Sequence, residues 1–132
     1  MNTLQQHSAF IKKTAAALGF DYCGVAKAVR LDADARRLED WLKKGMQGNM
    51  DYMEKYFDLR IDPSKLVAGA RSVITLLQNY FPEQKQADGA PKISKYAYGK
   101  DYHEVIREKL NALIHLIKEN IGEINGRGFV DS

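Results

Sequence analysis

The heptapeptide Ser72-Val73-Ile74-Thr75-Leu76-Leu77-Gln78 carries the strongest strand signal in the chain. Its residues are nearly all apolar and partly β-branched, which predicts a strand that is buried on both faces. A second apolar run, from Phe20 to Ala26, predicts a companion strand. Because the remaining periodic segments are helical, the expected fold class is α/β or α+β, with helices packed on a small sheet.

Cap residues and helical spacing predict helices on both sides of these strands. Thr3 and Gln6 have the spacing of a capping box, and Gly19 suits the C′ position of the same helix. Asp62-Pro63 is a cap and N1 pair that opens a short helix. The longest helix carries an apolar stripe made by Tyr102, Ile106, Leu110, Leu113, Ile117 and Ile121.

The other segments complete the predicted order. Asp32 is placed to cap a further helix. Met46 to Met53 predicts a turn followed by a short helix that runs to about Asp58. Phe129-Val130 has the character of a strand opening. We therefore expect residues 1–132 to form a single N-terminal domain of a longer protein.

Bulk composition limits the class of protein. The chain has 132 residues, of which 45% are hydrophobic and 28% charged, typical of one globular domain. It contains no apolar run long enough for a transmembrane helix and no secretory signal, so we expect no membrane contact. The single cysteine, Cys23, cannot form an internal disulfide, which favours a cytoplasmic setting. A net charge of +3 permits an anionic partner such as RNA.

One short segment is too aromatic for a plain connecting loop. It reads Ser94-Lys95-Tyr96-Ala97-Tyr98-Gly99-Lys100-Asp101-Tyr102-His103 and lies just before the longest helix. Such a segment suits a flat, polar ligand at a helix N-terminus. Tyr96 and Tyr98 alternate as on a strand, and packing of the phenol rings with their hydroxyls at the rim explains each tyrosine equally well. Asp101 is placed to cap the helix, which is compatible with a ligand role.

Other chemistry is weakly indicated. The three histidines, His7, His103 and His115, lack metal-ligand spacing, so no metal site is predicted. Cys23 has no visible activating group and is interpreted as an inert, buried thiol. Asp131 follows an apolar run near the last residue of the chain. The methionine-rich stretch around Tyr52 suits adaptable packing or a planar ligand.

Several stretches, in order, resemble the N-terminal region of epoxyqueuosine reductases. Each is weak alone, but together they span nearly the whole chain. They are Gly19-Phe20-Asp21-Tyr22-Cys23-Gly24-Val25-Ala26, Gly45-Met46-Gln47-Gly48-Asn49-Met50-Asp51-Tyr52-Met53, Leu66-Val67-Ala68-Gly69-Ala70-Arg71-Ser72-Val73-Ile74, Asn79-Tyr80, Tyr96-Ala97-Tyr98-Gly99-Lys100-Asp101-Tyr102-His103 and Val130-Asp131-Ser132.

The resemblance implies an activity and its cofactors. Such enzymes reduce epoxyqueuosine in tRNA to queuosine, using cobalamin and two 4Fe-4S clusters. Asp131 of the Val-Asp-Ser stretch would be the general acid that protonates the epoxide oxygen. A carboxyl group in that role must hold its proton near neutral pH, which requires a desolvated setting. The cobalamin-binding residues would be Tyr96, Tyr98, Gly99, Asp101, Tyr102 and His103.

The chain departs from the family in one respect, and this leaves alternatives open. It lacks the cysteine-rich cluster motifs, so we expect these residues alone to be inactive and to expose apolar surface that a second copy could cover. One alternative is a non-catalytic RNA-binding or interaction domain with the aromatic residues as stacking surfaces. Another is a flavin-dependent reductase, because aromatic and methionine-lined sites also suit flavins.

Overall fold

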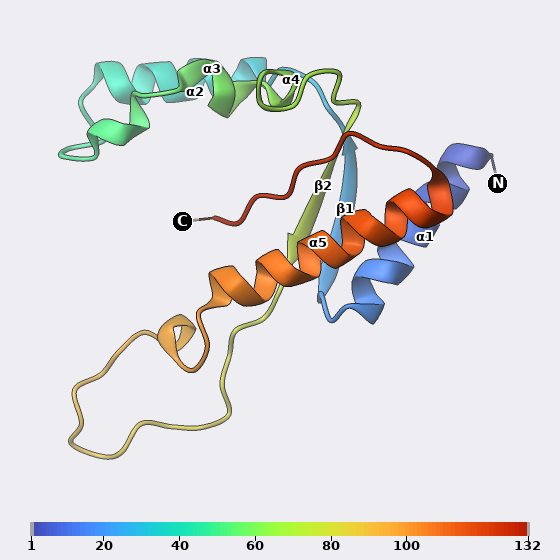
Figure 1. The fold of residues 1–132 in the computed structure, drawn as a ribbon. Helices are drawn as coiled ribbons and strands as arrows, with labels where there is room; N and C mark the ends of the chain where they lie inside the picture. Colours follow the sequence, from blue (N-terminus) through green and yellow to red (C-terminus); the bar gives the residue numbers. More distant parts are fainter. Residues whose placement is uncertain (1, 132) are drawn as a thin grey trace. The chain divides into compact units, whose positions relative to one another are not determined.

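A computed structural model of the chain describes residues 2–131 (Figure 1). Ser132, the last residue of the Val-Asp-Ser stretch, lies outside the described residues. The chain divides into two compact units, one formed by residues up to Gly24 and from Ile74 onward, the other by Val25–Val73. The elements, in order, are α1 (Thr3–Ala17), β1 (Tyr22–Lys27), α2 (Asp32–Lys43), the 3-10 turn η1 (Asp51–Met53), α3 (Phe57–Ile61), α4 (Pro63–Leu66), β2 (Ser72–Leu77), the 3-10 turn η2 (Lys95–Ala97) and α5 (Tyr102–Ile121).

The sheet consists of β1 and β2 paired side by side. The backbone N–H of Asp21 donates to the carbonyl of Leu77 at 2.9 Å, and that of Ala28 donates to Arg71 at 2.9 Å. Partners that advance in opposite directions along the chain define an antiparallel pair. Helices on a small antiparallel sheet confirm the predicted fold class in its α+β form.

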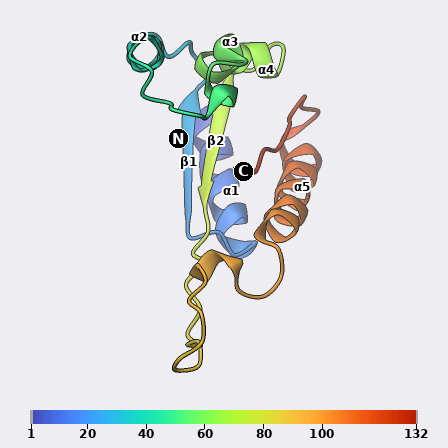
Figure 2. The ribbon, with the colours of Figure 1, turned by 90° about the vertical axis from the view of Figure 1, so that its left-hand side faces the viewer.

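The prediction that β2 is buried on both faces is wrong. Ile74 and Leu76 are half-buried and face the same way, whereas Val73 and Leu77 alternate with them and are exposed. In a strand, successive side chains point to opposite faces, so one face of β2 is covered and the other meets solvent. Helix α5 passes across the strands in Figure 1 and lies to one side of them in Figure 2, which agrees with cover on one face only.

The core of the first unit lies between α1 and α5, which pack against each other. Ala15 of α1 is fully buried, and Leu113 and Ile117 of α5 are 3% and 4% exposed. The cap of α1 differs from the prediction by one residue. Asn2, not Thr3, forms the capping box, because its side chain accepts from the Gln5 backbone and the Gln5 side chain accepts from the Asn2 backbone.

The turn between α1 and β1 is tied to α5 by a lysine. Gly19 has a φ of +93°, a left-handed conformation that favours glycine, as predicted for the C′ position. The Nζ atom of Lys109 donates to the Gln78 side chain at 2.9 Å and lies 5.6 Å from the centre of the Phe20 ring. A Cβ on Gly19 would sit 3.0 Å from the same Nζ.

We expect Gly19→Ala to lower the free energy of unfolding by about 1–2 kcal/mol, the usual cost of a left-handed non-glycine residue. It should additionally displace Lys109, because the new methyl group meets that side chain. The matched control is Gly48→Ala, which has a φ of +56° but no atom within 4 Å of its Cβ position. Urea unfolding measures both variants, and a smaller loss for Gly19→Ala than for Gly48→Ala would contradict the contact argument.

The second unit is built from α2, η1, α3 and α4. Its buried residues are Ala35 of α2 and Ile61 of α3. Leu31, not Asp32, is the N-cap of α2, and its backbone N–H donates to the Ile61 carbonyl at 2.8 Å. Asp32 pairs with Arg30 in place of the predicted cap.

Two further predictions fall in this unit. Asp62 caps α4, accepting from the Ser64 backbone at 3.0 Å, with Pro63 at N1 as the sequence indicated. The predicted single helix up to Asp58 is wrong, because Tyr56 adopts a left-handed φ of 59° and separates η1 from α3. In residues 2–131, no helix is long and apolar enough to cross a membrane.

Candidate functional site

The aromatic segment forms a turn and a helix start instead of the predicted strand. Tyr96 lies in η2, and Gly99 takes a φ of +72° that turns the chain toward α5. Asp101 caps α5 as predicted, because its carboxylate accepts from the His103 backbone N–H at 2.9 Å. The strand prediction for Tyr96 and Tyr98 is wrong because the residues fold into local turns and pair with no neighbouring strand.

Four rings form a continuous row that we call the aromatic cluster: Tyr80, Tyr96, Tyr102 and His103. The ring centres of Tyr80 and Tyr96 are 6.4 Å apart, and those of Tyr96 and Tyr102 are 5.9 Å apart, both edge to face. Tyr102 and His103 stack at 4.0 Å. Tyr80 and Tyr96 are 65% and 52% exposed, so the row presents ring surface and hydroxyl groups to solvent.

The residues that follow β2 place Tyr80 in this cluster. The Asp21 carboxylate accepts from the Asn79 backbone N–H at 2.6 Å, across 58 residues of sequence. The Asn79 side chain in turn accepts from the Phe81 backbone at 3.0 Å. Lys95 makes a cation–π contact with the next residue of this stretch, because its Nζ lies 3.9 Å from the centre of the Phe81 ring.

The chain after α5 returns along the helix and brings Asp131 to its N-terminal end. Gly128 lies so close to the helix that a Cβ there would be 3.2 Å from Leu110. The Tyr102 hydroxyl lies 3.5 Å from the backbone carbonyl of Asp131. The two parts of the sequence singled out for function, 29 residues apart, therefore meet at one place.

This return segment has no strand. Phe129 and Val130 were expected to open one, but residues 123–131 have no regular secondary structure. A strand needs a partner for its backbone hydrogen bonds, and the described residues offer the segment none. Asp131 itself is exposed.

The charge of Asp101 organises the N-terminus of α5. The hydrogen bonds that Asp101 accepts from the backbone and side chain of His103 hold the pKa of the Asp101 carboxyl below its usual value. The ring Nδ1 of His103 lies 2.8 Å from that carboxylate, and because a carboxylate only accepts, Nδ1 carries the hydrogen. Desolvation raises the pKa of the Tyr102 hydroxyl, and the negative charge of Asp131 raises it further.

Asp101 links stability to pH in a defined direction. A carboxyl whose pKa is lower in the folded state stabilises the fold above its unfolded pKa of 3.8, and that contribution is lost as the pH falls through the lower folded value. Asp101→Asn keeps a cap residue but removes the charge. We expect it to flatten the acid limb of a plot of unfolding midpoint against pH.

Asp101→Ala serves as the comparison, because it removes the cap as well and should lower the midpoint at neutral pH too. An acid limb as steep in Asp101→Asn as in the unchanged chain would contradict the assignment.

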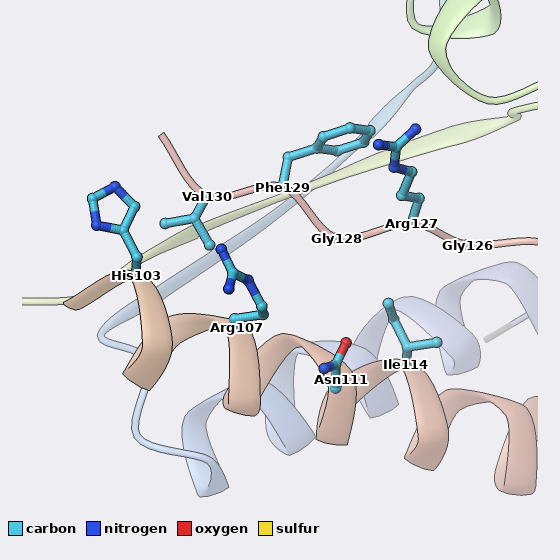
Figure 3. A pocket seen from close by; sticks show the side chains of 9 residues that line it. All are labelled: His103, Arg107, Asn111, Ile114, Gly126, Arg127, Gly128, Phe129 and Val130. Atoms are coloured by element: carbon cyan, nitrogen blue, oxygen red, sulfur yellow. The ribbon is translucent and has the colours of Figure 1, made fainter. Parts of the chain in front are cut away.

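A groove opens between α5 and the return segment (Figure 3). Its volume is about 570 Å³. Its lining residues are His103, Arg107, Asn111, Ile114, Gly126, Arg127, Gly128, Phe129 and Val130. Arg107 rises from the helix toward the return segment, whereas Arg127 and Phe129 point away from the helix, with the Arg127 guanidinium carbon 4.9 Å from the Phe129 ring centre.

The predicted site residues are only partly brought together. Tyr96, Asp101, Tyr102, His103 and Asp131 gather at the start of α5. Tyr98 is half-buried but belongs to none of the ring pairs above, and Gly99 contributes a turn.

Sequence reasoning missed the contribution of two residues. Arg107 and Asn111 follow His103 at intervals of four, so a polar stripe at helical spacing was available as a signal. The residues of the return segment that line the same groove follow no sequence pattern that could have indicated them.

Residues outside this region behave as simple surface or core positions. His115 is exposed and lies 3.1 Å from Glu119, one turn away on α5. Cys23 is half-buried and not buried as predicted. Its partial burial raises the pKa of the thiol, and the charge of Lys12 partly opposes this, so the raised pKa agrees with the inert part of the prediction. Within residues 2–131, no group of three or more His, Cys, Asp or Glu side chains is arranged to hold a metal ion.

Comparison with known proteins gives one consistent result. Residues 60–132, more than half of the chain, match the family described as "Epoxyqueuosine reductase QueG, DUF1730". The epoxyqueuosine reductase of Cellulophaga algicola is 58% identical over 132 residues, which are 100% of this chain and 43% of that protein. This chain therefore spans less than half of the length of that curated relative.

Solved structures agree with the sequence match. The epoxyqueuosine reductase of Streptococcus thermophilus superimposes with a TM-score of 0.72 at 26% identity, over 90% of this chain and 32% of that one. A crystal structure of epoxyqueuosine reductase with an epoxyqueuosine-modified tRNA-Tyr stem loop gives a TM-score of 0.71 at 25% identity, over 89% and 32%. The sequence match, the shared fold and the ordered motifs lead to one conclusion: the chain belongs to the epoxyqueuosine reductase family.

Proposed function

We propose that this chain supplies the N-terminal part of an oxidoreductase that converts epoxyqueuosine in tRNA to queuosine. The observation that carries the proposal is the return of the chain after α5, which brings Asp131 to Tyr102 and the aromatic cluster. The family match supports the same chemistry. A tRNA substrate is consistent with a cytoplasmic protein, and a related structure was solved with a modified tRNA stem loop.

Cobalamin is the cofactor that we assign to the aromatic cluster. The cluster presents exposed ring edges, ring faces and hydroxyl donors, which suit a flat macrocycle fringed by amide groups. Tyr96, Tyr98, Gly99, Asp101, Tyr102 and His103 would hold it. When bound, cobalamin would supply the reductive chemistry, with electrons from two 4Fe-4S clusters in other parts of the enzyme.

Asp131 is the proton donor of the proposed reaction. Conversion of an epoxide to an alkene takes up two electrons and two protons and releases the oxygen as water. Asp131 would donate the first proton to the epoxide oxygen as the ring opens. Because Asp131 is exposed, we expect the bound substrate to desolvate its carboxyl group, which favours the protonated form that the reaction needs. The Tyr102 hydroxyl, close to the Asp131 carbonyl, would orient the segment.

Basic residues would assist with the tRNA backbone. Lys95 directly precedes Tyr96, Lys100 lies two residues before Tyr102, and Arg71 precedes β2. We assign these three residues to phosphate contacts. Lys100 already pairs with Glu108 at 3.5 Å, so we expect that ion pair to open when RNA binds.

A cobalamin titration tests the proposal. Residues 1–132 would replace the corresponding part of the Cellulophaga algicola enzyme, because these 132 residues alone hold a single cysteine and should be inactive. We expect the visible spectrum of cobalamin to change on binding, and Tyr96→Ala with Tyr102→Ala to abolish the change.

The same chimera distinguishes the alternatives. A folded chimera that leaves the cobalamin spectrum unchanged would contradict the assignment of the cofactor. A spectral response to flavin mononucleotide instead would favour the flavin-dependent reductase, and RNA binding without turnover would favour a non-catalytic RNA-binding domain.

Self-association of the 132-residue chain stays a prediction. Val73 and Leu77 on the outward face of β2 are 38% and 57% exposed, which is apolar surface that a second copy could cover. Sedimentation velocity at several protein concentrations would detect a dimer, and Leu77→Lys should remove it. A sedimentation coefficient independent of concentration would contradict the prediction.

A further inference from the structure

The groove between α5 and the return segment has a polar floor, and two of its residues, Arg107 and Asn111, have no role in the proposed function. His103, Arg107 and Asn111 are spaced four residues apart, so they line one face of the helix. All three side chains carry N–H donors. The His103 N–H is the one at Nδ1, which Asp101 already accepts, so Arg107 and Asn111 supply the donors for a ligand.

The charge of the groove is unbalanced. Its nine lining residues include Arg107, which rises from the helix, and Arg127, which points away from it, but no carboxylate. Glu108 on the same helix is paired with Lys100. Among the described residues, no carboxylate oxygen lies within 4 Å of a guanidinium nitrogen of Arg107 or Arg127, whereas Arg30 and Arg37 of the second unit each have such a partner. Arg107 acts on the Asp101 carboxyl group only from a distance, so its guanidinium stays available to attract an anion.

The opposite wall is formed partly by two glycines. Gly126 and Gly128 have no side chain to fill the groove, and Gly128 is held against Leu110. In the part of the chain that the structure describes, the backbone N–H groups of residues 126–130 donate to no backbone carbonyl. A volume of about 570 Å³ exceeds what a single small ion needs and lies in the range of small-molecule sites.

We propose that this groove binds a phosphodiester group, with Arg107 as the main contact and Asn111 and the glycine backbone as further donors. Guanidinium groups bind phosphate oxygens in pairs, which makes arginine the suitable residue. The choice of ligand rests on the proposed function, in which both the RNA backbone and the nucleotide tail of cobalamin carry a phosphodiester. Val130 lines the groove and precedes Asp131, so the anion would be held beside the proton donor.

A titration of the ¹⁵N-labelled 132-residue chain tests the proposal. The probes are an anticodon-type RNA hairpin, cobalamin, cobinamide (the same corrin without the phosphate-bearing tail) and inorganic phosphate. We expect the amide signals of Gly126, Gly128 and the Asn111 side chain to shift with phosphate and with at least one of the larger probes. The variant Arg107→Gln with Arg127→Gln should weaken that binding about tenfold or more.

The matched control is Arg36→Gln with Lys118→Gln, which removes the same charge at exposed positions outside the groove. For the RNA hairpin, the groove variant should also flatten the plot of log affinity against log salt by roughly 0.7–0.9, the share of the one phosphate contact assigned to Arg107. Equal weakening by both variants, or shifts confined to residues outside the groove, would overturn the proposal.

The probes separate the two sources and the two proposals. Tighter binding of cobalamin than of cobinamide, lost in the groove variant, assigns the groove to the nucleotide tail, whereas a loss confined to the hairpin assigns it to RNA. Binding of phosphate and hairpin in the groove without any cobalamin binding would leave the groove standing and contradict the cofactor proposal. Equal binding of cobalamin and cobinamide with no groove shifts for any probe would contradict the groove proposal and leave the cofactor proposal standing.

Discussion

Replacement of Asp131 by Asn should lower turnover by about 10²- to 10⁴-fold, the usual contribution of a positioned general acid. The amide keeps the size and polarity of the carboxyl group but has no proton to donate to the epoxide oxygen. Because the Asp131 contact to Tyr102 runs through the backbone carbonyl, the substitution should leave the return segment in place. Single-turnover assays of the Cellulophaga chimera with an epoxyqueuosine-containing stem loop measure the effect.

Two comparisons make this result specific. Cobalamin binding, followed by its visible spectrum, should be unchanged in Asp131→Asn, which separates loss of chemistry from loss of cofactor. Asp88→Asn, in the exposed loop before η2, should leave turnover unaltered. Normal turnover by Asp131→Asn would remove Asp131 from the acid role.

Leu113→Ala should have the largest effect on stability. Leu113 is 3% exposed in the core between α1 and α5, and removing a buried leucine side chain costs about 2–5 kcal/mol. Since small domains have only about 5–15 kcal/mol in total, this variant should be close to unfolding at 37 °C. Urea denaturation followed by circular dichroism gives the midpoint.

Leu4→Ala is the control for the same substitution in a helix. Leu4 is 76% exposed on α1, so its loss should change the free energy of unfolding by no more than about 0.5 kcal/mol. Similar midpoints for the two variants would show that α1 and α5 do not share a core.

Local signals in the sequence predicted local structure well. The Asp62-Pro63 pair, the glycine after α1 and the Asp101 cap each fix a helix end through their own backbone chemistry. Where two neighbouring residues fit one pattern, the sequence could not choose between them. Asn2 and Gln5 have the same spacing as Thr3 and Gln6, and only the three-dimensional path of the chain selects the first pair.

Features that depend on tertiary contacts were not predictable. Whether both faces of β2 are covered depends on which helices lie beside it. The apolar sequence of the strand does not indicate which helices these are. Tyr80 joins the aromatic cluster through the bond between Asp21 and the Asn79 backbone, which spans 58 residues. The family resemblance gave Asp131 and Tyr102 roles in one enzyme, but their contact was not predicted, because no local pattern indicates where the chain goes after Gly122.

The length of α5 and the length of the return segment are matched, and this leaves the chain almost no slack. The helix has 20 residues, or about 30 Å at 1.5 Å per residue. The ten residues from Gly122 to Asp131 cover about 33 Å when extended at 3.3 Å per residue. The length of helix α5 therefore determines how far the following residues must extend for Asp131 to reach Tyr102. Deleting one residue between Gly122 and Gly126 would draw the carboxylate back from Tyr102 by about one residue's length, so indels here should be tolerated far less than in the exposed loop before η2.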